Sequence, residues 1–138
     1  MTSRLFLKLI AAGLCLLVVA LVVADVLATR VATASYIQNL TRQLAEEARL
    51  LAWMHSGGQL VMKPESARAL AQAVRARVTV VAPDGRVNAD SEVAPEKMEN
   101  HRDRPEISHA LAGREGSSIR HSPTIGRDFL YVAVPLNG

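Results

Sequence analysis

The first 28 residues are dominated by one long apolar segment. Residues 9–24 contain 15 apolar side chains out of 16. The stretch 5–28 would extend about 36 Å as a helix, and a hydrocarbon core is about 30 Å thick. This stretch is therefore long enough to cross a bilayer with some tilt. We expect a transmembrane helix over residues 9–28.

The next stretch, residues 29–55, has a helical pattern of its own. It contains no Gly or Pro, and apolar side chains recur at spacings of three or four residues, which predicts an amphipathic juxtamembrane helix. Two interpretations of this stripe stay open: it packs on its own domain, or it forms a parallel dimer seam with a second copy. The stripe consists of Ile37, Leu40, Leu44, Ala48 and Leu51.

The polar part of the chain, residues 64–138, begins with a helix and a hairpin. The run Ser56-Gly57-Gly58 should end the long helix, and a second helix should start at Pro64. Residues 78–81 are mostly β-branched and predict a buried strand. The turn at residues 83–86, which contains Pro and Gly, should return the chain into a strand over residues 87–91.

The remaining residues predict a short helix and a second hairpin. Residues 92–104 are polar and turn-like, and residues 105–111 should form a short helix that Gly113 closes. Strands are expected over residues 117–122 and 129–135, with a loop between them. Two antiparallel hairpins with helices before and between them indicate an α+β domain, with helices on one face of an antiparallel sheet.

Charge places the two parts of the chain on different sides of the membrane. Arg4 and Lys8 precede the span, so residues 1–8 should stay in the cytoplasm and the domain should lie outside it. After residue 28 the chain has 14 basic and 12 acidic side chains, interleaved and without a basic stripe. We therefore expect no nucleic-acid partner. A cleaved signal peptide stays open as an alternative, because Ala32-Thr33-Ala34 resembles a cleavage site.

The order of short motifs in the polar part resembles a known class of sensor. Residues 78–91 (VTVVAPDGRVNADS) resemble the first hairpin of an extracytoplasmic PAS-like (Cache-type) sensor domain. The match continues through residues 98–101 (MENH), 104–106 (RPE), 110–113 (ALAG) and 131–135 (YVAVP). With the preceding helix, the chain is similar to the N-terminal region of phosphate-regulon-type (PhoR-like) sensor histidine kinases of bacterial two-component systems.

The resemblance implies a function and a larger protein. It implies that the chain lies in the bacterial inner membrane as a homodimer and detects an extracytoplasmic ligand or partner protein. The signal would pass to a kinase domain elsewhere in the protein, which would use ATP and Mg²⁺ and phosphorylate a cognate response regulator. In the PAS-like order a fifth strand lies between the first and the fourth. The domain over residues 64–138 would then be incomplete, and the chain would be a fragment.

Other outputs are compatible with the same outer domain. A chemoreceptor, a diguanylate cyclase and a single-span membrane adaptor stay open. The chain itself offers no catalytic motif: no histidine is followed by Glu, as the family's phosphoacceptor is, and no Gly-rich ATP lid is found. We expect no catalytic residue, no metal site and no cofactor within these residues. His101 and His109 are expected to be solvated loop histidines.

A ligand site is the chemistry that the resemblance favours. In PAS-like sensors the ligand lies against the sheet, under the segment between the second and third strands, which is residues 90–116 here. A guanidinium binds carboxylate or phosphate bidentately, so Arg104 and Arg120 are candidate anion ligands. As alternatives, Arg104 pairs with an acidic neighbour, Asp90 caps a loop, or His101 senses acidity. The candidate polar lining is Asp90, Ser91, His101, Arg104, Arg120 and Tyr131.

Overall fold

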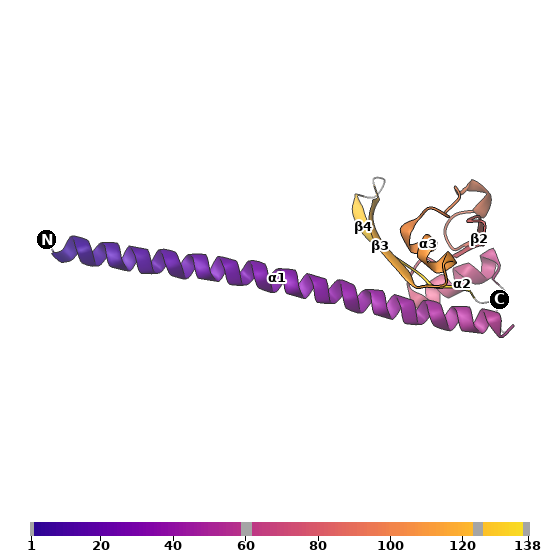
Figure 1. Ribbon diagram of the computed structural model, residues 1–138, viewed down its shortest axis with the longest axis horizontal. Coiled ribbons are helices and arrows are strands. Elements are labelled where there is room, and N and C mark those ends of the chain that lie inside the picture. The colour runs from indigo at the N-terminus through magenta and orange to yellow at the C-terminus, as the bar shows by residue number, and fades with distance from the viewer. Residues whose placement is uncertain (1, 59–61, 123–125, 137–138) are drawn as a thin grey trace. The chain divides into compact units, whose positions relative to one another are not determined.

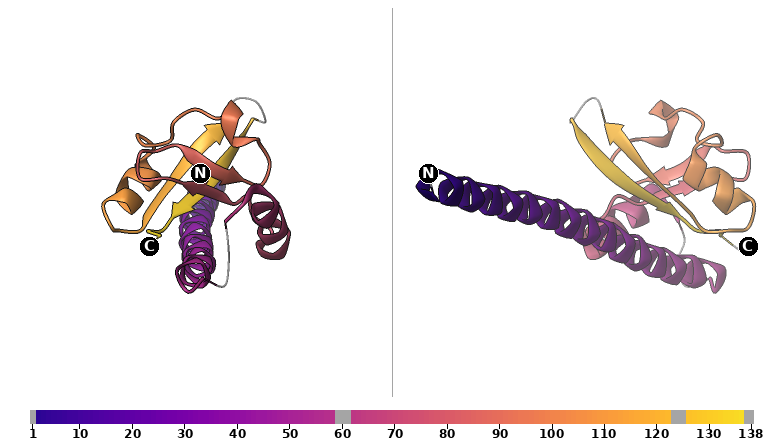
Figure 2. Two further views of the ribbon diagram at one scale, coloured as in Figure 1. Left: turned by 90° about the vertical axis from the view of Figure 1, so that its right-hand side faces the viewer. Right: turned by 60° about the vertical axis from the view of Figure 1, so that its left-hand side comes forward.

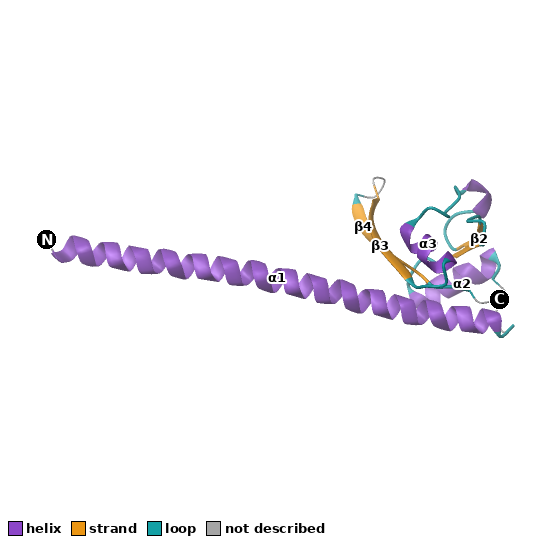
Figure 3. Cartoon of the chain, viewed as in Figure 1, coloured by secondary structure: helices purple, strands orange, loops and turns teal. Residues whose placement is uncertain are grey.

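The computed structural model describes residues 2–58, 62–122 and 126–136. The chain divides into two compact units, residues 1–40 and 41–138. Figure 1 labels the helices and strands along the chain, and Figure 3 colours them by type. Only the second unit has strands within the described residues, so any site built on a sheet belongs to it.

The first helix, α1 (Thr2–Ser56), contains the whole apolar segment and the stretch that follows it. Its most apolar 18-residue window has a mean hydropathy of 2.8 and is not buried by other parts of the chain. By length and composition α1 can therefore cross a membrane. As predicted, the helix ends before Gly57 and Gly58, and Gly58 has a positive φ of 69°.

The C-terminal turns of α1 belong to the second unit. Ala45 and Ala52 are buried there, and three members of the predicted stripe, Leu44, Ala48 and Leu51, are half-buried. This apolar face is thus partly covered by the chain's own domain. The role of the stripe as a dimer seam stays a prediction.

The first hairpin packs on the second helix, α2 (Pro64–Val74). β1 (Thr79–Val81) pairs antiparallel with β2 (Val87–Asp90). A small apolar core of Ala67, Val80 and Ala89 joins the helix to the hairpin. The strand predicted over residues 78–81 is present as β1, but the prediction that it is buried was wrong, because in β1 only Val80 is buried. Alternate side chains of a strand point to opposite faces, and Thr79 lies on the exposed one.

The turn between β1 and β2 is held by a later loop. Gly85 has a φ of 88°, which agrees with the predicted turn. Its carbonyl accepts a hydrogen bond from the backbone N–H of His101 (2.8 Å). The side-chain amide of Asn100 donates to the carbonyl of Asp84 (2.9 Å). A Cβ at Gly85 would overlap Asn100 and Arg102, so this close approach requires glycine.

The second hairpin is formed by β3 (Gly116–Ser122) and β4 (Arg127–Ala133). The short helix α3 (Pro105–Leu111) packs against β3, as Figure 2 shows. A Cβ at Gly116 would meet the Glu106 Cα and the His109 Cβ at 2.8 Å, so helix and strand meet backbone to backbone. This contact brings Glu106 over the face of β3.

The two hairpins are separate two-stranded antiparallel sheets among the described residues. The α+β class expected from the sequence is confirmed. Strand bounds differ slightly: β3 begins one residue earlier than predicted, and β4 covers residues 127–133 instead of 129–135. A 3-10 helix, η1 (Pro95–Lys97), lies in the polar segment. The predicted loop between β3 and β4 lies largely outside the described residues.

Candidate ligand site

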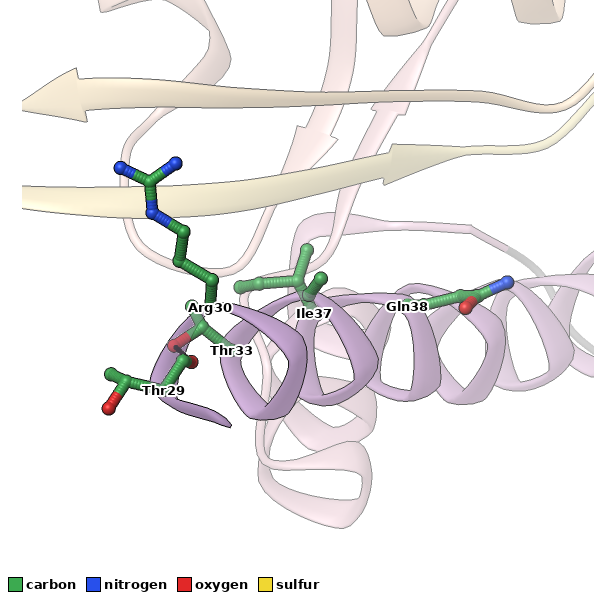
Figure 4. A pocket seen from close by; sticks show the side chains of 6 residues that line it. Thr29, Arg30, Thr33, Ile37 and Gln38 are labelled. Atoms are coloured by element: carbon green, nitrogen blue, oxygen red, sulfur yellow. Dashed lines mark hydrogen bonds between the residues drawn. The ribbon is translucent and has the colours of Figure 1, made fainter. Parts of the chain in front are cut away.

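Two surface hollows are open, and neither contains any of the six residues that were predicted to line a ligand site. One lies along α1, and all six of its lining residues belong to that helix: Thr29, Arg30, Thr33, Ala34, Ile37 and Gln38. Figure 4 shows their side chains along successive turns of α1. The other lies between β2 and η1 and is lined by Arg86, Val87, Asn88, Pro95, Glu96, Met98 and Asn100. Neither gathers several convergent polar groups in an enclosed space, as a ligand site does.

Asp90 closes the open end of the first hairpin. It is only 1% exposed. Its Oδ2 accepts hydrogen bonds from Arg77 Nε (3.0 Å) and Thr79 Oγ1 (2.6 Å). Its Oδ1 accepts the backbone N–H groups of Glu92 and Val93, both at 2.9 Å. Asp90 therefore caps the following loop, which was the alternative to its predicted role as a ligand-binding residue.

Internal partners also hold Ser91. Its Oγ accepts the backbone N–H of Val78 (3.1 Å), and its own N–H donates to the Val78 carbonyl (3.0 Å). The hydroxyl group and the backbone N–H of Ser91 thus extend the pairing of β1 and β2 by one more residue pair. The structure gives Ser91, like Asp90, a role in the hairpin, and their part in ligand binding stays a prediction.

The second group of predicted residues gathers between α3 and the second hairpin. Arg120 Nη2 donates to Glu106 Oε1 (2.6 Å), and Ser118 Oγ donates to Glu106 Oε2 (2.5 Å). Residues 118 and 120 lie on the same side of β3 because they are two apart. The Arg120 guanidinium also lies 3.9 Å from the ring centroid of Tyr131 on β4, a cation–π contact.

Glu106 was not among the predicted site residues. It is 3% exposed, and its carboxylate is paired and hydrogen-bonded, as a buried charge must be. Its partners lie 12 and 14 residues away in the sequence. The sequence did indicate that Ser118 and Arg120 share one face of β3, because side chains two residues apart on a strand point to the same side. It did not indicate which residue of another element lies against that face.

His101 is buried, which corrects the prediction of a solvated loop histidine. It is 3% exposed because the loop that carries it is tied to Gly85. The backbone of Glu99 and Asn100 lies close to the ring and acts to raise the pKa of the imidazole, but burial outweighs this. Burial lowers the pKa of His101 below its ordinary value of 6.5, and the charge of Arg104 lowers it further. His109, by contrast, is exposed as expected.

Arg104 immediately precedes α3 and is partly exposed. Within the described part of the chain its guanidinium makes no hydrogen bond and no ion pair. Partial burial lowers the pKa of Arg104, and the nearby charge of Arg120 adds to this. Glu106 acts in the opposite direction, but it is hydrogen-bonded to Arg120 instead. The alternative in which Arg104 pairs with Asp103 or Glu106 is thus not what the structure shows.

The six predicted residues therefore divide into two groups. Asp90 and Ser91 belong to the first hairpin, whereas four residues share one electrostatic neighbourhood between α3 and β3–β4: His101, Arg104, Arg120 and Tyr131. Among the described residues, no group of three or more His, Cys, Asp or Glu side chains is placed to hold a metal ion.

Comparison with known proteins assigns the chain to a family. The family model described as single Cache-like matches residues 34–138, which is most of the chain. No match was found among curated proteins or among solved structures. Domains of this type are typical of extracellular sensor domains in bacterial signalling proteins. The match agrees with the long apolar helix and the small antiparallel sheets. The chain therefore belongs to the single Cache-like family of sensor domains.

Proposed function

We propose that this chain is the membrane-anchored sensor region of a PhoR-like bacterial histidine kinase, with its Cache-like domain outside the cytoplasm. The observation that carries the proposal is continuity. The family match begins at residue 34, inside the same helix that is long and apolar enough to cross a membrane. A change in the domain can therefore act directly on the membrane helix.

The contacts of the last turns of α1 suggest how such a change is transmitted. Arg49 Nε lies 2.6 Å from Glu115 Oε1, in the connection between α3 and β3. Both side chains are about half exposed, so the pair contributes little stability and can be broken at small cost. A shift of α3 on ligand binding would alter this pair through the short connection that carries Glu115. Signalling requires two arrangements of α1 with similar energy.

The further parts of this proposal concern partners. The homodimer would be formed by a second copy, and a kinase domain elsewhere in the protein would bind ATP and Mg²⁺. Its phosphoryl group would pass to a cognate response regulator. The membrane would be the bacterial inner membrane, with residues 1–8 on the cytoplasmic side.

A topology experiment tests the location of the domain. Alkaline phosphatase, which is active only outside the cytoplasm, is fused after Leu136, and we expect an active, membrane-bound enzyme. The double variant Arg4→Glu, Lys8→Glu removes the positive side chains before the span and should lower that activity. An inactive fusion in the wild-type chain would contradict the outer location. Release of a shortened chain from the membrane would instead support a cleaved signal peptide.

A second experiment tests the output. In the presence of Mg²⁺, membranes that contain the product of the whole reading frame should transfer the γ-phosphoryl group of ATP to a histidine, giving an acid-labile phosphohistidine and ADP. A methyl-accepting or diguanylate cyclase domain after residue 138 would overturn the kinase but keep the sensor. A stop codon there, with a cooperatively folding domain, would favour the membrane adaptor.

A further inference from the structure

Two opposite charges lie at the outer end of the apolar segment of α1, which is long and apolar enough to cross a membrane. Asp25 lies inside the span expected over residues 9–28, about 4.5 Å along the helix axis from its outer end, and Arg30 follows shortly after that end. Both side chains are exposed, and among the described residues neither takes part in an ion pair. A charge in or next to the hydrocarbon core normally pairs with another charged or polar group.

The helix itself cannot pair Asp25 with Arg30. Side chains five residues apart are separated by about 140° around a helix, whereas side chains three or four apart face each other. No residue three or four positions from Asp25 is basic, and none at those distances from Arg30 is acidic. The long side chain of Arg30 can reach towards water, but the short carboxylate of Asp25 cannot reach as far. Asp25 therefore needs a cation that another chain supplies.

A spacing of five residues joins opposite charges between two parallel helices. In the heptad abcdefg, ion pairs between helices form from g to e, and the e position of the following heptad comes five residues after g. Two copies with the same membrane orientation have parallel helices, and most membrane helices pack with this left-handed geometry. With Asp25 at g, Arg30 of a second copy lies opposite it at e. Two-fold symmetry repeats the pair on the other side of the contact.

The positions between the two charges suit close contact of two helices. This register places Val26 and Thr33 at a, and Thr29 and Tyr36 at d. Thr29 and Thr33 are small and line the open hollow along α1 (Figure 4), so a second helix can approach there. Thr33 Oγ1 donates to the carbonyl of Thr29 (2.9 Å), so the hydroxyl keeps its partner when a second helix covers it. Val26 is 46% exposed and Tyr36 is 66% exposed, so the single chain leaves this face open.

We propose that Asp25 of one copy and Arg30 of a second copy form two symmetric ion pairs, which hold parallel α1 helices together at the outer end of the membrane segment. The inference rests on the proposed function and deepens it, because it names a contact of the homodimer. The register places Tyr36, and not Ile37, at the centre of the contact. It therefore assigns the dimer contact near the membrane to the exposed face of α1 and not to the predicted apolar stripe.

The test uses the full chain in phosphatidylcholine vesicles, with copies labelled at the N-terminal amine by a donor or an acceptor fluorophore. Energy transfer, measured against the ratio of chain to lipid, gives the dissociation constant of the dimer. Asp25→Arg and Arg30→Asp each place like charges opposite one another, and each should weaken the dimer by at least about tenfold. The double variant restores opposite charges in exchanged positions, and its affinity should stay within about threefold of wild type.

Arg42→Asp is the matched control, because it makes the same charge change at an exposed position of the same helix. Residue 42 takes position c in this register, which points away from a second helix, so the affinity should stay within about twofold of wild type. Asp25→Asn removes the carboxylate without changing the positive side chains that orient the span. It should weaken the dimer by about threefold or more, even if a charge reversal disturbs insertion.

A double variant that dimerises as weakly as either single variant would overturn the ion pair, and so would equal losses in the Arg30 and Arg42 variants. Weakening by Arg30→Asp alone, with no effect of Asp25→Arg, would assign Arg30 to a lipid headgroup instead. A wild-type dimer that ignores these charges rejects the contact but keeps the homodimer of the proposed function. A wild-type chain that stays monomeric at every lipid ratio rejects both, whereas the topology and phosphorylation experiments measure the sensor function separately.

Discussion

The imidazole of His101 is a buried neutral group near two arginines. Since its pKa in the folded chain lies below 6.5, the unfolded chain binds more protons than the folded chain as pH falls through this value. The free energy of unfolding should therefore decrease from about pH 7 towards pH 5, a window above the ordinary carboxylate range. Urea unfolding of the full chain in micelles, followed by hydrogen exchange of the domain, measures this.

The variant His101→Phe should remove most of that pH dependence, because phenylalanine fills a similar space and does not titrate. His109→Asn is the control, since His109 is exposed on α3. Its curve of stability against pH should follow the wild type. Parallel curves for wild type and His101→Phe would show that another group causes the dependence.

Asp90 offers a second prediction at a single carboxylate. Burial alone would raise its pKa, but the hydrogen bonds from Thr79, Arg77 and two backbone amides together lower it below 3.8. Asp90→Asn keeps an oxygen for the amides but loses the acceptor for Thr79 and Arg77, and should cost about 2 kcal/mol at pH 7. The wild-type stability from this group is present above pH 3.8 and is lost as pH falls through the lowered pKa.

Urea titration at pH 7 and at pH 3 tests this assignment, and the difference between wild type and Asp90→Asn should shrink at the lower pH. Asp84→Asn is the matched control, because Asp84 is an exposed partner of Arg86 in the same hairpin. It should change stability by less than about 0.5 kcal/mol. Equal effects of the two substitutions would contradict a structural role for the buried position.

At the level of residues, the sequence predicted which side chains lie at the candidate site better than it predicted whether each of them is buried. Arg104, Arg120 and Tyr131 were selected from the sequence by their side-chain type and by their place in the order of motifs that resembles the sensor family. The structure places these three residues in one neighbourhood. The sequence placed His101 in solvent, because its burial depends on the contact between its loop and Gly85, far away in the chain. It could not identify Glu106, whose burial results from the packing of α3 on β3.

At the level of elements, helices were predicted closely because their ends carry local signals. Gly57 and Gly58 end α1, and Pro64 starts α2. Strand ends shifted by one or two residues, since they depend on pairing across the hairpin and not on local propensity. That β1 is exposed on one side could not be predicted, because the sequence does not show which face α2 covers.

The contact between α3 and β3 gives a prediction at this scale. Gly116→Ala would place a methyl group against the Glu106 backbone and the His109 Cβ, and α3 would have to move away from the strand. We expect a loss of about 2 kcal/mol in the free energy of unfolding, typical of overpacking. The shift should also weaken the Arg120–Glu106 pair, which the arginine Nε–H signals report by NMR.

Ser117→Ala is the control for Gly116→Ala, because residue 117 is the next position of β3 and is exposed. It should stay within about 0.5 kcal/mol of wild type. A Gly116→Ala variant as stable as this control would mean that α3 does not approach β3 as closely as the structure has it.

At the scale of the molecule, the arrangement of α1 in a dimer decides how a signal crosses the membrane. If the stripe forms a parallel seam, cysteines at Ile37, Leu44 and Leu51 should crosslink between copies more readily than neighbouring positions, because these sites are seven residues apart. The experiment replaces Cys15 with Ser, introduces one cysteine at a time, and measures disulfide dimers in membranes after mild oxidation.

The matched control set is Tyr36, Gln43 and Leu50, which has the same spacing but lies about 100° away around the helix. Leu44 and Leu51 are half-buried within one chain, whereas Tyr36 and Leu50 are exposed large side chains. Preferential crosslinking of the first set would mean that the domain packs loosely enough for its apolar face to be shared with a second copy. Preferential crosslinking of the control set would assign the stripe to packing within the chain and move the dimer contact to the exposed face. A seam on that face would leave the Arg49–Glu115 contact undisturbed, so both copies could transmit a shift of α3 to α1 through it.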